Sequence, residues 1–184
     1  MEYRSLGSTG LRVSAIAFGG APAGLANYLS PYDPDDPAQA EQVIAAVGRA
    51  LELGITYFDT ALSYGQGRSE RFFGEARRRA GPLAAGMLLA TKVPGGRRTY
   101  EGVLESVETS LRNLAVETID MPQIAYNILH QDAYNLLVSA GPIVEAKARG
   151  MGVVTMRSLS SGNVDLVQRK VHRLDLEALH QRYV

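Results

Sequence analysis

The sequence predicts an α/β fold in which the strands of a parallel sheet alternate with helices after an amino-terminal β-hairpin. Short runs rich in β-branched and aromatic residues recur along the chain, and segments with apolar residues at helical spacing separate them. This alternation is typical of right-handed βαβ units, whose strands pair in parallel. With 184 residues, of which 46% are hydrophobic, the chain is long enough for one domain with its own core. We therefore expect residues 1–184 to form a single domain.

The charge and cysteine content exclude several classes of function. Nineteen basic residues balance nineteen acidic ones, so nothing points to a nucleic acid or an anionic membrane as a partner. The absence of cysteine excludes disulfides, thiol nucleophiles and thiolate metal sites, and no His, Asp or Glu cluster has the spacing of a metal site. No apolar run has the length of a signal peptide core or a membrane span, so we expect a cytoplasmic protein.

The first part of the chain is expected to hold a hairpin, a strand, a loop and a helix. The hairpin covers residues 3–14, the strand covers 15–18, and the proline- and aspartate-rich stretch 21–37 is a long loop. Asp36 and Pro37 then have the pattern of an N-cap followed by a first-turn proline. The helix after them has an apolar face formed by Val43, Ile44, Val47 and Leu51.

The next strand and helix carry most of the informative residues. The strand covers residues 55–58, and Asp59 lies where its apolar run ends. Ser69 is expected to be the N-cap of the helix that follows. The core positions of that helix are expected to be Phe72, Phe73 and Ala76.

Three further strands complete a set of five after the hairpin. They are expected at residues 87–91, at 118–126 and at 152–156, with Lys92 at the end of the first. A helix begins at Thr99 between the first two of these strands. Its inward positions are expected to be Val103, Val107, Leu111 and Leu114.

Three polar side chains, Asp59, Tyr64 and Lys92, lie at or just after the carboxyl ends of predicted strands. In a parallel barrel those ends converge, so the three can meet. An ammonium beside a phenol stabilises the phenolate, and a carboxylate keeps the ammonium charged and oriented. Such a tyrosine can donate its proton to a carbonyl oxygen while a cofactor delivers hydride to the carbon. The alternative is a helix-capping aspartate and a half-buried loop tyrosine without catalytic roles.

The motifs around these residues resemble those of the aldo/keto reductase family, and their order along the chain is the same. The run from Gly54 to Ala61 reads Gly-Ile-Thr-Tyr-Phe-Asp-Thr-Ala. The other matching stretches are the hairpin at 6–14, Tyr64-Gly65, Ser69-Glu70, residues 90–93, residues 123–127 and residues 153–162.

The resemblance implies a (β/α)₈ barrel of TIM type that uses NADPH to reduce small aldehydes or ketones. It assigns Asp59, Tyr64 and Lys92 to the catalytic tetrad, whose fourth member is a histidine. Ala125 stands where the family pattern has that histidine, and His130 is expected to be an ordinary surface residue. Since a full barrel takes about 250 residues, we expect an incomplete barrel, with family sequence missing at an apparent junction near residues 121–122.

The resemblance also implies a set of cofactor-binding residues. Gln123 would hold the nicotinamide carboxamide, and the strand and loop at 153–162 would flank the nicotinamide and the pyrophosphate. The chain stops at Val184, before the family segment that grips the adenosine phosphate. The residues expected to bind NADPH are Gln123, Met156, Arg157, Ser158, Leu159 and Gly162.

Two functions are compatible with the sequence. The first is an NADPH-dependent carbonyl reductase in a shortened form, with Tyr64 as the general acid. The second is a degenerate relative that folds, or binds a nucleotide or a partner, without turnover. An open parallel sheet also exposes two strand edges that can pair with another copy, so a homo-oligomer or a poorly soluble chain is expected.

Overall fold

The structure is a computed structural model that describes residues 1–7, 9–94, 99–125, 143–144, 148 and 154–156. The chain divides into two compact units. The first comprises residues 1–123 and 146–154 and contains most of the described residues. Of the second unit, the structure describes the ends of two strands and Ile143-Val144.

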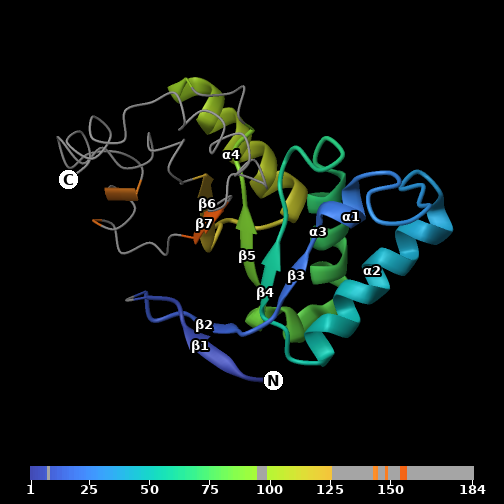
Figure 1. The fold of residues 1–184 in the computed structure, drawn as a ribbon, viewed down its shortest axis with the longest axis horizontal. Helices are drawn as coiled ribbons and strands as arrows, with labels where there is room; N and C mark the ends of the chain where they lie inside the picture. The colour runs from blue at the N-terminus through green and yellow to red at the C-terminus, as the bar shows by residue number, and fades with distance from the viewer. Residues whose placement is uncertain (8, 95–98, 126–142, 145–147, 149–153, 157–184) are drawn as a thin grey trace, which may run out of the picture. The chain divides into compact units, whose positions relative to one another are not determined.

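The predicted hairpin and the five predicted strands are confirmed (Figure 1). β1 (Tyr3–Ser5) and β2 (Arg12–Ser14) pair in antiparallel fashion, and a second sheet has the order β3-β4-β5-β6-β7. The pairs β3–β4, β4–β5 and β5–β6 are parallel. Over the described residues these strands form a sheet that is not closed into a barrel. The strands of the second sheet are β3 (Ala17–Gly19), β4 (Tyr57–Asp59), β5 (Leu88–Thr91), β6 (Met121–Ala125) and β7 (Val154–Met156).

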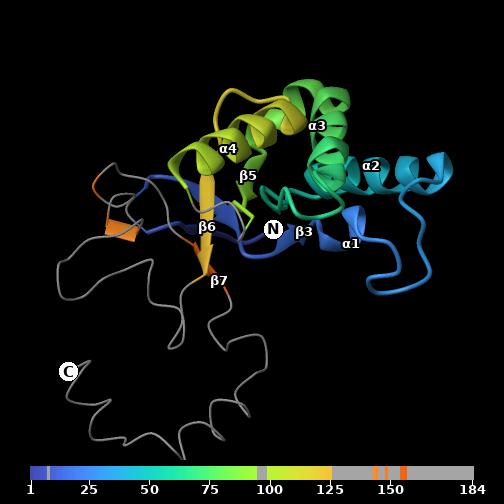
Figure 2. The ribbon, with the colours of Figure 1, turned by 90° about the horizontal axis from the view of Figure 1, so that it is seen from above.

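Helices lie along one side of the sheet (Figure 2). They are α1 (Ala21–Gly24), α2 (Pro37–Glu52), α3 (Arg68–Ala80) and α4 (Tyr100–Leu114), with a 3₁₀ helix, η1, at Gly81–Gly86. The start of α2 is as predicted, because the Asp36 carboxylate accepts a hydrogen bond from the Ala38 N–H at 2.8 Å. Among the helices that the structure describes, none is long and apolar enough to cross a membrane.

The main core lies between the sheet and the helices. Its centre is a group of three aromatic rings, Phe18, Phe58 and Phe73, with centroids 5.8 to 6.0 Å apart. A smaller cluster occupies the opposite face of the sheet, where Val13 of the hairpin packs with Ala90 and Met121. The hairpin therefore covers part of the sheet face that the helices leave open.

Two predicted details of the helices are wrong. Gly67, in the left-handed conformation, is the N-cap of α3, and Ser69 lies within the helix, where its hydroxyl is buried. On α4, Leu114 is buried as predicted, but Ser106 and Ser110 are buried beside it. Val107 and Leu111 are only half-buried. Val103, one turn before Ser106, has 37% of its surface exposed.

The apparent junction near residues 121–122 lies inside β6. Met121 is fully buried, and the strand register aligns Ala90 with Met121 and Thr91 with Pro122. The Asp120 carboxylate accepts a hydrogen bond from the Leu89 N–H at 2.9 Å just before the strand begins. The chain therefore enters the sheet beside β5 without interruption.

The basic end of α3 is held by carboxylates. Glu75 accepts hydrogen bonds from Arg78 and Arg79, and these bonds lower the pKa of its carboxyl group to about 2. Arg79 also pairs with Glu41 of α2. These side chains are solvent-accessible. The arginines at the end of α3 therefore have a role in stabilising the helix end.

Glu75→Gln is expected to change the acid sensitivity of the fold slightly. The folded carboxyl group has a pKa of about 2 against an ordinary value of 4.5, so its stabilising contribution is present above pH 4.5 and is lost as the pH falls towards 2. The midpoints of urea unfolding for the two proteins should converge from pH 6 to pH 3. Salt should reduce the difference at pH 6 because the pair is exposed. Parallel pH profiles for the two proteins would contradict this assignment.

Candidate active site

Asp59 and Lys92 lie at the carboxyl ends of two neighbouring strands of the parallel sheet. Asp59 is the last residue of β4, and Lys92 directly follows β5. The register aligns Asp59 with Ala90, so Lys92 stands two residues beyond the level of the carboxylate. Successive side chains of a strand point to opposite faces. Asp59 therefore shares a face with Tyr57, whereas Phe58 between them enters the helix-side core.

The Lys92 ammonium forms a salt bridge with the Asp59 carboxylate and donates a second hydrogen bond to the Thr60 carbonyl oxygen at 2.8 Å. The Lys92 side chain is only 10% exposed and that of Asp59 is 28% exposed. A largely buried ammonium needs such partners to remain charged. The strand ends thus hold a positive charge in a fixed position.

Tyr64 lies beside this pair. The Lys92 nitrogen is 4.9 Å from the centroid of the Tyr64 ring, within the range of a cation–π contact. The structure therefore brings Asp59, Tyr64 and Lys92 together. Lys92 contacts the face of the Tyr64 ring and links it to Asp59.

Two glycines let the loop that carries Tyr64 pack closely on α1. A side chain at Gly24 would meet the Tyr64 carbonyl oxygen at 2.3 Å, and one at Gly65 would meet the Gly24 carbonyl oxygen at 2.1 Å. Gly65 also has a φ of +65°, which favours glycine. The backbone on either side of Tyr64 is consequently held against α1.

Buried polar side chains support the strand ends from the helix side. The fully buried Glu70 carboxylate accepts hydrogen bonds from the Thr91 hydroxyl at 2.7 Å and from the Asn113 amide at 2.9 Å. The Thr60 hydroxyl donates to the Ser69 hydroxyl, which donates to the Gly20 carbonyl oxygen, each at 2.8 Å. Because Thr60 and Thr91 adjoin Asp59 and Lys92, these bonds fix the backbone from which the ion pair extends.

Gln123 of β6 also reaches this face of the sheet. Its amide nitrogen donates a hydrogen bond to the Tyr57 hydroxyl oxygen at 2.9 Å. Burial raises the pKa of Tyr57, the Gln123 hydrogen bond opposes this, and the nearby Asp59 charge raises the pKa further. Tyr57 is therefore a neutral phenol at physiological pH. The sequence analysis missed it, although strand alternation already sets Tyr57 and Asp59 on one face.

Several predicted residues lie outside the part of the site that the structure describes. The backbone of Met156 belongs to β7. The other cofactor-binding candidates, together with His130, fall outside the described residues: Arg157, Ser158, Leu159 and Gly162. Over the described ranges there is no group of three or more His, Asp or Glu side chains that could hold a metal.

A hollow of about 760 Å³ lies at the other end of the strands. It is lined by the start of β5, the end of α4 and η1, with Arg77 and Arg112 among its lining residues. Lys92 is at the opposite, carboxyl end of β5. None of Asp59, Tyr64 and Lys92 is among its lining residues, so the hollow is separate from that polar cluster.

The sequence was compared with protein-family models and with curated proteins. The model of the aldo/keto reductase family matches residues 15–169. L-galactose dehydrogenase of Arabidopsis thaliana is 33% identical over 125 residues, which cover 66% of this chain and 37% of that protein. A probable voltage-gated potassium channel subunit beta of the same species is 28% identical, covering 66% of this chain and 36% of that protein. The chain thus spans less than two fifths of the length of these relatives.

Solved structures show the same fold. A thermostable aldo-keto reductase in complex with epalrestat has a TM-score of 0.60 at 22% identity, covering 89% of this chain and 58% of that one. An aldo/keto reductase from Klebsiella pneumoniae in complex with NADP and acetate has a TM-score of 0.56 at 23% identity, covering 79% and 45%. An aldo-keto reductase from Bacillus halodurans in its holo form has a TM-score of 0.55 at 27% identity, covering 85% and 51%.

Proposed function

Because the chain belongs to the aldo/keto reductase family, we propose that it is an oxidoreductase that reduces small aldehydes or ketones to alcohols with NADPH. The observation that carries this proposal is the contact of one buried ammonium, Lys92, with both the Asp59 carboxylate and the Tyr64 ring. The proposal includes Tyr64 as the general acid and the remainder of a TIM-type barrel around the five-stranded sheet.

Lys92 would assist the acid step through the ring that it faces. When Tyr64 donates its proton to the substrate oxygen, the negative charge left behind spreads over the phenolate oxygen and ring. A cation over the ring face lowers the energy of that charge in a poorly solvated site. Asp59 would hold the Lys92 ammonium in place through their salt bridge. The bond formed on the substrate oxygen is O–H, and the proton lost by Tyr64 is later replaced from solvent.

Among the residues that the structure describes, the Gln123 amide has hydrogen-bonding groups suited to the nicotinamide end of NADPH. NADPH, when bound, supplies the hydride that the substrate carbon receives. Gln123 carries an amide whose nitrogen faces Tyr57, so its oxygen is turned the other way and can accept a hydrogen bond from a carboxamide. Met156, Arg157, Ser158, Leu159 and Gly162 are proposed to hold the rest of the cofactor. The NADP present in the Klebsiella pneumoniae structure supports this choice of nucleotide.

A second candidate is a relative that binds nucleotide without turnover. Ala125, the last residue of β6, stands where the family pattern has a histidine, and this observation favours loss of activity. Removing one hydrogen-bond donor from an active site commonly costs about 10²–10³-fold in rate. The two candidates share cofactor binding and differ in catalysis.

Two measurements on the purified full chain separate these functions. NADPH fluorescence titration is expected to show saturable binding, and NADPH absorbance at 340 nm is expected to fall only when an aldehyde is added. The substrate panel should include L-galactose with NADP⁺ in the oxidative direction, since a 33% identical relative carries that name. Binding without turnover would select the second candidate. If NADPH does not bind, both candidate functions are wrong.

A further inference from the structure

The hydrogen bond between Tyr57 and Gln123 crosses the central strand of the polar face. Tyr57 belongs to β4 and Gln123 to β6, and β5 lies between them. The β5–β6 register aligns Thr91 with Pro122, so its continuation by one residue sets Gln123 beside Lys92. Aligned residues of parallel strands point to the same face. Gln123 therefore shares this face with Lys92, and its amide nitrogen donates a hydrogen bond to the Tyr57 hydroxyl oxygen.

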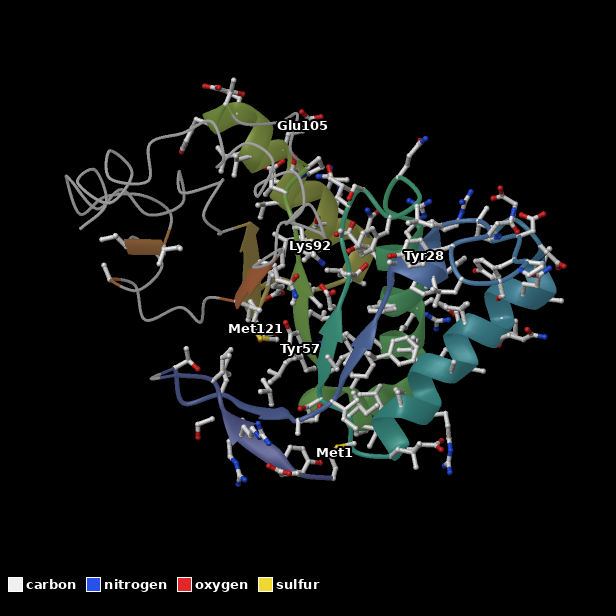
Figure 3. The ribbon with its side chains drawn as sticks, in the orientation of Figure 1. Met1, Tyr28, Tyr57, Lys92, Glu105 and Met121 are labelled. Atoms are coloured by element: carbon white, nitrogen blue, oxygen red, sulfur yellow. The ribbon has the colours of Figure 1, made fainter. Side chains whose placement is uncertain are left out.

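The depth of Tyr57 suits it to an indirect role. It precedes Asp59 by two residues, and its ring packs against the cluster of Val13, Ala90 and Met121. Figure 3 shows Tyr57 farther than Lys92 from the carboxyl ends of the strands. The Tyr57 oxygen thus contacts Gln123 on the amino-terminal side of the strand ends. At that position it would not contact a substrate held at Tyr64.

The hydrogen bond to Tyr57 holds the Gln123 amide in one place on the polar face. A terminal amide can rotate by half a turn and exchange its donor and acceptor sides. Because the Tyr57 oxygen accepts from the nitrogen at 2.9 Å, the amide oxygen and the second N–H are directed away from Tyr57. A group with one donor and one acceptor side by side is complementary to that pair, and a primary carboxamide is such a group.

We propose that Tyr57 is a positioning residue that holds the Gln123 amide at the place where it can bind the carboxamide of a nicotinamide ring. This inference rests on the proposed function and adds a residue to it. Without the Tyr57 oxygen the Gln123 side chain loses this hydrogen bond and samples other rotamers, in which the amide no longer meets the ligand. Tyr57 therefore affects the nicotinamide end of the nucleotide and leaves the adenosine end unaffected.

Tyr57→Phe tests this proposal because phenylalanine keeps the packing and removes only the oxygen. Isothermal titration calorimetry of the full chain would compare NADP⁺ with adenosine 2′,5′-bisphosphate, which lacks the nicotinamide. We expect Kd for NADP⁺ to rise about three- to tenfold, the usual value of one hydrogen bond, and Kd for the bisphosphate to stay unchanged. Gln123→Ala should weaken NADP⁺ binding similarly, and the double variant should be no weaker than Gln123→Ala alone.

Tyr28→Phe is the matched control, because Tyr28 is 55% exposed. It should leave both dissociation constants unchanged. The proposal is wrong if Tyr57→Phe weakens both ligands equally, weakens neither, or prevents folding, since each result would give Tyr57 a purely structural role or none. If Tyr57→Phe weakens the binding of neither ligand, the proposed reductase function would still stand. If the unsubstituted protein binds neither ligand, the proposed function itself fails, which is a distinguishable result.

Discussion

Tyr64→Phe is expected to lower kcat for aldehyde reduction about 10²–10⁴-fold, the usual contribution of a general acid. The substitution removes the proton donor and keeps the ring that Lys92 faces at 4.9 Å. The contacts of Lys92 with Asp59 and Thr60 do not involve the lost hydroxyl, so the fold and NADPH affinity should be retained. The loss should therefore fall on the chemical step, measured by single-turnover oxidation of bound NADPH.

The control for this prediction is Tyr28→Phe, which removes the same hydroxyl from an exposed ring. Its kcat should match that of the unsubstituted protein. Full activity of Tyr64→Phe would refute Tyr64 as the acid. A loss of NADPH binding that parallels the loss of rate would instead assign Tyr64 to nucleotide binding.

Phe73→Ala is expected to destabilise the fold by about 3–5 kcal/mol, the usual cost of truncating a fully buried phenylalanine. Phe73 has no exposed surface and packs edge-on against both Phe18 and Phe58. Since domains of this kind have a free energy of unfolding of roughly 5–15 kcal/mol, the variant should lose a large fraction of its stability. Its Tm should fall by on the order of 10 °C, measured by circular dichroism.

Tyr100→Ala provides the comparison, because Tyr100 is an aromatic residue of α4 with 74% of its surface exposed. Truncation there should change Tm by no more than about 2 °C, since exposed substitutions are usually within 0.5 kcal/mol of neutral. Equal losses for the two variants would show that the three-ring cluster does not form the centre of the core.

The meeting of Asp59 and Lys92 was predictable from sequence because it depends on one rule. Each residue follows a recognisable apolar strand, and parallel neighbours end at the same edge. The inward face of α4 was not predictable in this way. The 3.6-residue pattern of valines and leucines indicated one face, but Ser106 and Ser110 are buried together with Leu114. Which side of a helix is covered depends on the elements that pack against it, and periodicity does not encode that tertiary property.

The sequence by itself determined the alternation of strands and helices, the start of α2 at Asp36, and the strand-end positions of Asp59, Tyr64 and Lys92. These follow from local preferences and from the period of the apolar residues, which act within a few positions along the chain. Only the tertiary structure decided that Lys92 faces the Tyr64 ring, that Gln123 reaches across β5 to Tyr57, and that Glu70 joins Thr91 to Asn113. Those contacts join residues up to 66 positions apart, and their partners are chosen by strand register and packing, because no local rule acts over such separations.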